Sequence, residues 1–102
     1  MRDQIFLPDE IILYQNYPNP FNPSTTINFS IFSQSFVSLK VYDILGNEVA
    51  ILLNEVMPAG NYEVAFNSKN LPNVKTTLPS GVYLYKLTAG GNSQTKKMIL
   101  LK

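Results

Sequence analysis

The sequence predicts an all-β fold, an immunoglobulin-like antiparallel β-sandwich of about seven strands. Apolar residues recur at every second position in several short runs, which is the period of a strand with one buried face. Turn-forming residues separate these runs at intervals of roughly 8–12 residues, and no stretch of helical length shows an apolar period of 3.6. The 102 residues leave room for one domain. We expect residues 1–12 to be a linker or upstream segment and residues 13–102 to form the sandwich.

The first strand is predicted over residues 11–17. It runs into the segment YPNPFNPST, residues 17–25, whose three prolines each fix φ and remove a backbone donor. Such a segment is incompatible with a central strand. We predict a stiff extended crossing that is anchored in the core by Tyr17 and Phe21.

Four further strands are predicted, three of them by alternating apolar and polar residues and one by a run, residues 49–53, that is apolar on both faces. They cover residues 25–32, 36–43, 48–54 and 61–67. The residues expected to face the core are Ile27, Phe29, Ile31, Val37, Leu39, Val41, Tyr62, Val64 and Phe66. An irregular stretch, residues 68–79, follows these strands and contains a small insertion at residues 73–78.

The last predicted element is a β-hairpin over residues 80–102. One face of its first strand is made of Tyr83, Tyr85, Leu87 and Ala89. Gly90-Gly91 suits the tight turn because glycine takes positive φ at no steric cost. An apolar return strand is predicted over residues 98–101. We expect the chain to end inside this strand, and we expect that ending to serve the function.

The composition excludes several classes of function. The net charge is +1, too small for the basic footprint of a nucleic-acid-binding protein. The absence of Cys and His removes disulfides, thiolate metal sites and the commonest general base. The seven carboxylates are scattered, and no calcium loop or phosphate-binding glycine loop occurs. We therefore expect no enzyme and no cofactor, and with no apolar run of about 20 residues we expect no direct membrane insertion.

Some residues allow two interpretations. The rings of Tyr62, Tyr83 and Tyr85 are suited either to the core or to stacking on a sugar, and their strand spacing favours the core. Asn28 begins an Asn-Phe-Ser glycosylation pattern, although the outward face of a strand explains it more simply. The lysines among the last seven residues serve either to protect a sheet edge or as a receptor-read address.

Five motifs occur in a fixed order along nearly the whole chain, from about residue 13 to residue 102. They are NYPNPFNPSTTINFSI, VSLKVYDILGNEVAIL, PAGNYEVAFN, LPSGVYLYKLTAG and the terminal TKKMILLK. Together they resemble the C-terminal sorting domain of the type IX secretion system, type A, the Por secretion tail family. Each motif alone is loose, but five in order are specific.

The resemblance implies a non-catalytic, immunoglobulin-like secretion signal at the end of an exported cargo, which the present sequence lacks. Its expected partners are the outer-membrane type IX secretion machinery and a sortase-like peptidase. The peptidase is expected to remove the domain upstream of Leu13 or to anchor the cargo at the cell surface, so that the cargo is secreted or surface-bound by way of the periplasm and outer membrane. The recognition residues implied by the matching motifs are Ser80, Gly81, Val82, Tyr83, Lys96, Lys97, Met98, Ile99, Leu100, Leu101 and Lys102.

We hypothesise that the last strand offers unpaired backbone groups at a sheet edge, and that the machinery adds a strand there. Such an edge also suggests a dimer that pairs edge to edge. The alternative function is an accessory module that binds carbohydrate or protein beside a secreted enzyme, because the VYDILGNEV and SGVYLYKL motifs also resemble sandwich modules of that kind. A passive structural spacer is a third possibility.

Overall fold

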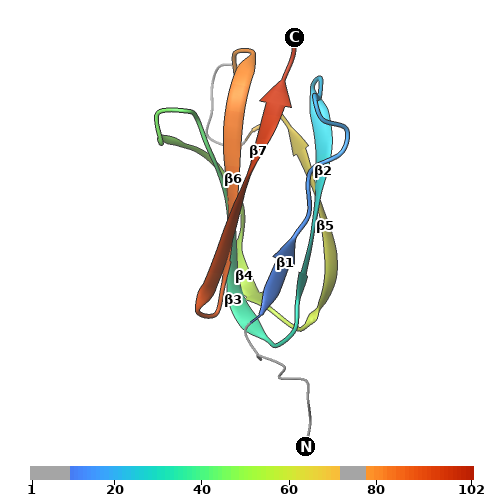
Figure 1. Ribbon diagram of the computed structural model, residues 1–102, viewed down its shortest axis with the longest axis vertical. Helices are drawn as coiled ribbons and strands as arrows, with labels where there is room; N and C mark the ends of the chain where they lie inside the picture. The colour runs from blue at the N-terminus through green and yellow to red at the C-terminus, as the bar shows by residue number, and fades with distance from the viewer. Residues whose placement is uncertain (1–9, 72–77) are drawn as a thin grey trace, which may run out of the picture.

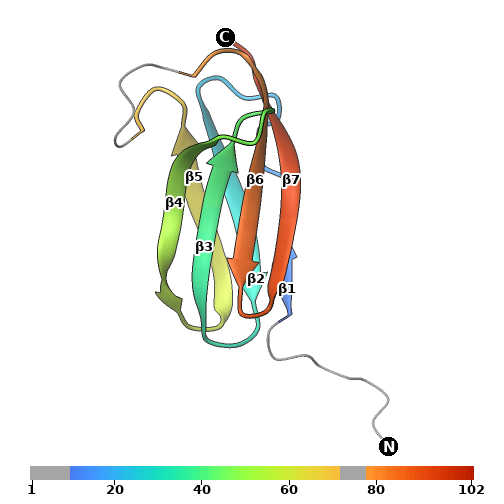
Figure 2. The same cartoon turned by 90° about the vertical axis from the view of Figure 1, so that its left-hand side faces the viewer.

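Seven antiparallel strands form two facing sheets in the computed structural model, which describes residues 10–71 and 78–102. The strands are β1 (Ile11–Leu13), β2 (Ser24–Ile31), β3 (Ser35–Tyr42), β4 (Glu48–Met57), β5 (Gly60–Asn67), β6 (Gly81–Ala89) and β7 (Asn92–Leu100). One sheet has the order β1-β2-β5 and the other the order β4-β3-β6-β7 (Figure 1 and Figure 2). The predicted all-β sandwich of about seven strands is confirmed.

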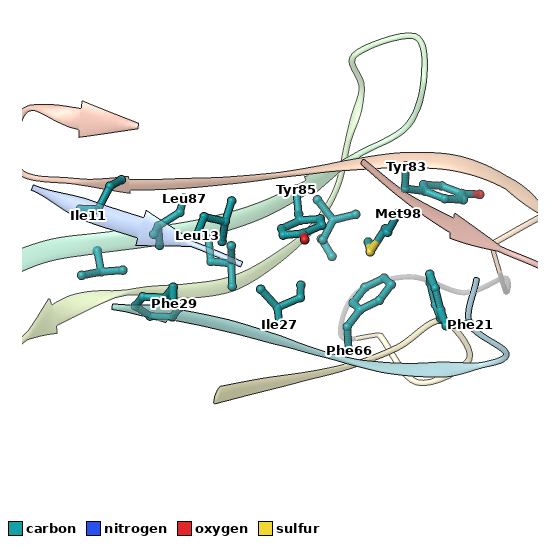
Figure 3. Close-up of a cluster of buried hydrophobic side chains, with 14 of the residues drawn as sticks. Ile11, Leu13, Phe21, Ile27, Phe29, Phe66, Tyr83, Tyr85, Leu87 and Met98 are labelled. Carbon is teal, nitrogen blue, oxygen red and sulfur yellow. The ribbon is translucent and has the colours of Figure 1, made fainter. Parts of the chain in front are cut away.

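The core lies between the sheets and is built from every second residue of the strands, as the alternating pattern predicts. Phe29 and Ile27 of β2 face Leu87 and Tyr85 of β6 across it (Figure 3). All nine predicted inward residues, which lie on β2, β3 and β5, face the core, although Tyr62 and Val64 are only partly buried. The predicted inward face of the last hairpin, residues 83, 85, 87 and 89, is fully or almost fully buried.

Three predicted strands have different limits in the structure. β1 ends at Leu13 instead of residue 17, because the Gln15 side chain and the Asn16 amide bond to β7 and β6 of the opposite sheet. Pairing with β2 returns only as an isolated bridge at Tyr17. β4 continues to Met57, three residues beyond the predicted end, paired with β3 as far as Ser35. β7 begins at Asn92 instead of Met98, because its polar first half pairs with β6 residue by residue from the hairpin turn. Polar residues are tolerated there because β7 is an edge strand.

The proline-rich crossing places its two aromatic residues differently. Phe21 is 2% exposed and packs edge to face on Phe66, with ring centroids 5.8 Å apart, so its predicted role as an anchor is confirmed. Tyr17 is 81% exposed, and its predicted anchoring is wrong. The backbone of Tyr17 pairs with Thr26, whose neighbours Thr25 and Ile27 point into the core. Directly opposed residues share a face, so Tyr17 points outward with Thr26.

The expected domain start and the expected insertion lie next to residues that the structure does not describe. The strand β1 begins at Ile11, so the sandwich includes two residues that precede the expected domain start at Leu13. Most of the expected linker, residues 1–9, lies outside the described residues, as do residues 72–77, which contain nearly all of the expected insertion.

Candidate recognition end of the C-terminal hairpin

Pairing of β6 with β7 brings together the two groups of residues that the sequence motifs single out. The register places Gly81 opposite Leu100, Val82 opposite Ile99 and Tyr83 opposite Met98. Beyond the strand, the Lys102 amide donates to the Ser80 hydroxyl oxygen at 2.9 Å. Residues 80–83 and 98–102 therefore form one structural unit at the end of the sandwich where β7 finishes (Figure 1).

The predicted recognition residues divide between the core and the surface. Tyr83, Met98 and Leu100 are buried and are available only to the core. The residues that reach solvent are Ser80, Val82, Lys97, Ile99, Leu101 and Lys102. Since successive side chains of a strand point to opposite faces, the neighbouring lysines Lys96 and Lys97 do not form one basic cluster. Lys97 lies on the outer face, whereas Lys96 is half-buried on the side of Met98.

Lys97 belongs instead to a basic stretch on the outer face of the four-stranded sheet. Lys40 of β3 and Lys86 of β6 are directly opposed, and Lys97 pairs with Leu84, two residues from Lys86 on the same face. Lys40 also forms an ion pair with Glu48 of β4, at 3.5 Å. Such an exposed pair adds little stability. Because Glu48 offsets the charge of Lys40, Lys86 and Lys97 carry the net positive charge of this stretch.

The outer edge of β7 is already occupied by the crossing segment, residues 15–21, which we call the edge clasp. The Gln15 side-chain amide donates to the Lys97 carbonyl at 2.7 Å, and the Asn19 side-chain oxygen accepts from the Ile99 amide at 2.9 Å. The Phe21 amide donates to the Ile99 carbonyl at 2.9 Å, and the Phe21 carbonyl accepts from the Leu101 amide at 3.0 Å. The hypothesis of an open strand edge is therefore wrong for residues 97–101.

Two further contacts tie β7 and its neighbour β6 to the start of the chain. The Gln94 side chain accepts from the Leu13 amide at 2.9 Å and donates to the Ile11 carbonyl at 3.1 Å, which links β7 to β1. The buried Tyr85 hydroxyl donates to the Tyr14 carbonyl and accepts from the Asn16 amide, both at 2.8 Å. Burial raises the pKa of Tyr85, so the hydroxyl stays protonated and can make both bonds.

The start of β6 is held in a similar way. The Tyr83 hydroxyl donates to the Pro79 carbonyl at 2.6 Å. Burial, and secondarily the charge of Asp43, raises the pKa of Tyr83. Asp43 closes the β3–β4 turn, where hydrogen bonds from the Asn47 backbone and side chain and from the Leu45 backbone lower its pKa.

The polar members of the clasp were not among the predicted site residues. In the sequence, Asn19 is notable only because it precedes a proline, and the predicted first strand, residues 11–17, includes Gln15. The sequence signal for the clasp is the density of Asn-Pro pairs in one segment. It indicates an ordered, extended crossing but does not indicate which strand the crossing covers.

The alternative interpretations of individual side chains are resolved by the structure. Tyr83 and Tyr85 are buried, and Tyr62 stacks on Phe29 with ring centroids 5.3 Å apart, so these three rings form no sugar platform. Asn28 lies exposed on the outer face of β2, as predicted. Among residues 10–71 and 78–102, no three acidic groups come close enough to hold a metal ion. The same residues contain no helix of the length and hydrophobicity needed to cross a bilayer.

Comparisons with known proteins agree with these features. The profile of the family described as "Secretion system C-terminal sorting domain" matches residues 15–101. No curated protein matches the sequence. Among solved structures, dimeric latent PorU from Porphyromonas gingivalis is similar, with a TM-score of 0.71 and 22% sequence identity. The match covers 94% of this chain and 10% of the PorU chain, so the likeness concerns the fold of a small part of that protein.

Proposed function

The chain belongs to the family of secretion system C-terminal sorting domains, and from this membership we propose that its recognition site is the solvent-facing end of the β6–β7 hairpin. Domains of this family are sorting signals of the type IX secretion system, which exports cargo through the outer membrane to the cell surface or the medium. The family is non-catalytic, and we propose that this chain likewise acts by being recognised and not by catalysis.

Side chains, and not an open edge, are the groups that this end offers to a partner. Val82 and Ile99 are directly opposed on the outer face, and Leu101 is 53% exposed just beyond the strand. They form a short apolar strip whose backbone edge the clasp covers. Recognition of a folded surface therefore replaces the strand-addition hypothesis, since adding a strand at residues 97–101 requires displacement of the clasp first.

Charge defines the second property of the expected partner. Lys97 borders the apolar strip and Lys86 continues the positive face away from it. A matching surface on the secretion machinery carries an apolar patch with acidic residues beside it. Exposed lysines contribute more to the rate of association than to affinity, so this step is expected to slow as the salt concentration rises.

The arrangement of the chain separates recognition from cargo. β1 begins at one end of the sandwich, and β7 finishes at the other (Figure 1). We propose that the cargo precedes the domain, residues 13–102, and that a sortase-like peptidase cuts upstream of Leu13. The machinery can then hold the recognition end while the junction stays accessible. If the chain dimerises through a strand edge, β4 is better suited than residues 97–101, which the clasp covers.

The test is export of a fluorescent cargo that carries a periplasmic signal and this domain, in a bacterium with the type IX machinery. Deleting residues 96–102 is a poor test because it removes the buried Met98 and Leu100. The informative variant is the double substitution Ile99→Ser and Leu101→Ser, which changes only the surface strip. We expect several-fold less cargo outside the cell and accumulation in the periplasm.

The matched control is Ile12→Ser. Ile12 and Ile99 are both 37% exposed on edge strands, but they lie on different sheets. The role of charge is tested by comparing cargo export in Lys97→Glu and in Lys69→Glu. Lys69 is an exposed lysine in the loop after β5. If the double variant folds and is exported as well as the Ile12→Ser control, the recognition end lies elsewhere.

A further inference from the structure

The outer face of the three-stranded sheet carries an open depression of about 660 Å³ that has no part in the recognition end. Its walls include Tyr14, just after β1, Asn28 and Ser30 of β2, and Asn61 and Glu63 of β5. A volume of this size lies within the range of small-molecule sites in proteins. Phe29 and Tyr62 also line the depression, but Phe29 is fully buried and the Tyr62 ring stacks on it. The exposed Tyr14 ring and the four polar side chains suggest a ligand that has both apolar and hydroxyl surfaces.

Strand pairing sets the spacing of these side chains. Asn28 is directly opposite Glu63, and Ser30 is directly opposite Asn61. The Tyr14 amide donates to the Asn28 carbonyl at 3.0 Å, so Tyr14, Asn28 and Glu63 form one row across three neighbouring segments. Adjacent strands lie about 4.8 Å apart, so the row spans about 10 Å. Tyr14 is 46% exposed, which leaves part of its ring open to a ligand.

The polar groups are held in place but keep free bonding capacity. Ser30 is 4% exposed, and its hydroxyl donates to the Asn61 side-chain oxygen, which orients this amide and leaves its two N–H donors unused. Neither the Asn28 amide nor the Glu63 carboxylate bonds to another side chain in the described part of the protein. The depression therefore presents fixed donors beside strong acceptors, on rigid strands.

We propose that this depression binds an uncharged saccharide of one or two sugar units. A sugar hydroxyl both donates and accepts, which matches an amide next to a carboxylate. The C–H face of a sugar ring is complementary to the negative face of an aromatic ring such as that of Tyr14. Among the described residues, no lysine or arginine lines the depression, so the Glu63 carboxylate repels acidic sugars and phosphates. Of Tyr62, Tyr83 and Tyr85, only Tyr62 borders the depression, and its ring is stacked on Phe29, so Tyr14 supplies the ring that is open to a ligand.

The first experiment titrates the ¹⁵N-labelled full chain with cellobiose, maltose, mannobiose, chitobiose and digalacturonic acid, followed by amide chemical shifts. At least one neutral disaccharide is expected to give saturable shifts that centre on residues 14, 28–30 and 61–63. The expected dissociation constant is on the order of 1 mM, as for a single shallow site. Digalacturonic acid is expected to give none. If no neutral sugar gives saturable shifts at these residues, the proposal is overturned.

Variants of the full chain then locate the site. Tyr14→Ala is expected to weaken binding about tenfold through the lost ring contact. The backbone carbonyl of Tyr14 that binds Tyr85 remains in this variant. Tyr17→Ala is the matched control, because Tyr17 is a more exposed tyrosine of the same segment that does not line the depression. Glu63→Gln is expected to admit digalacturonic acid. Equal losses in Tyr14→Ala and Tyr17→Ala would place binding elsewhere and overturn the proposal.

Discussion

Replacing Asn19 by alanine tests whether the clasp closes the edge of β7. The substitution removes the oxygen that accepts from the Ile99 amide at 2.9 Å and leaves the backbone bonds of Phe21 in place. A neutral hydrogen bond contributes about 0.5–1.5 kcal/mol to the free energy of unfolding. Because this bond is exposed, water can replace the lost acceptor, so we expect the lower part of that range, about 0.5–1 kcal/mol. A loss of this size lowers the Tm by about 2–8 °C.

Urea denaturation measures the overall loss, and amide hydrogen exchange locates it. We expect the Ile99 amide to exchange faster by more than the global loss explains, since its bond partner is gone. The neighbouring Met98 amide should follow the global stability alone, because Met98 pairs with Tyr83 on β6.

The control is Asn22→Ala, in the same segment. Asn22 also precedes a proline and is exposed, but its side chain bonds to no other residue in the described part of the chain. If the Ile99 amide exchanges at the same rate in Asn19→Ala and Asn22→Ala, the Asn19 bond does not protect the edge, and the proposed closure of β7 fails at this point.

Three further predictions concern the core and the turn near the recognition end. Leu87→Ala should lower the free energy of unfolding by about 2–4 kcal/mol in urea denaturation, since Leu87 is fully buried; a near-neutral result would contradict its place in the core. Tyr85→Phe should cost about 1–3 kcal/mol, because the buried Asn16 amide loses its partner, and an unchanged midpoint would show that another acceptor replaces the hydroxyl. Hydrogen bonds to Asp43 lower its pKa from 3.8, so the stability it contributes is present above that pH and is lost as the pH falls through its folded-state pKa. In Asp43→Asn, the free energy of unfolding should therefore fall less below about pH 4 than in the unchanged protein. An identical pH dependence below about pH 4 in both proteins would contradict a stabilising role of the ionised Asp43.

Local patterns in the sequence were sufficient for most of the strands and for the core. The alternation through Ile27, Phe29 and Ile31 predicts a strand with one buried face because side chains of a strand point alternately to its two sides. The same alternation correctly predicts that Tyr85 and Leu87 are buried. It fails for the first half of β7, where an edge strand needs no apolar period and its pairing with β6 decides the limits.

Sequence patterns predicted the candidate site less well than the fold. Motif similarity selects Lys96 and Lys97 together, but the pleat of the strand sends them to opposite faces. Tyr17 and Phe21 are aromatic residues of one proline-rich segment, yet pairing with Thr26 turns only Tyr17 outward. A contact between residues some 80 positions apart, such as that of Asn19 with Ile99, leaves no periodic signal in the chain.

By itself, then, the sequence determined the class of fold, the composition of the core and the family of the protein, because periodicity and ordered motifs are local properties of the chain. The tertiary structure alone decided that residues 80–83 and 98–102 meet, that only some of them reach solvent, and that the clasp covers the edge of the last strand. It also decided that Tyr14, Asn28 and Glu63 share one row on the opposite sheet. The physical reason is that faces and edges of a sheet are created by pairing between distant segments, and which side chains share a face depends on the register of that pairing.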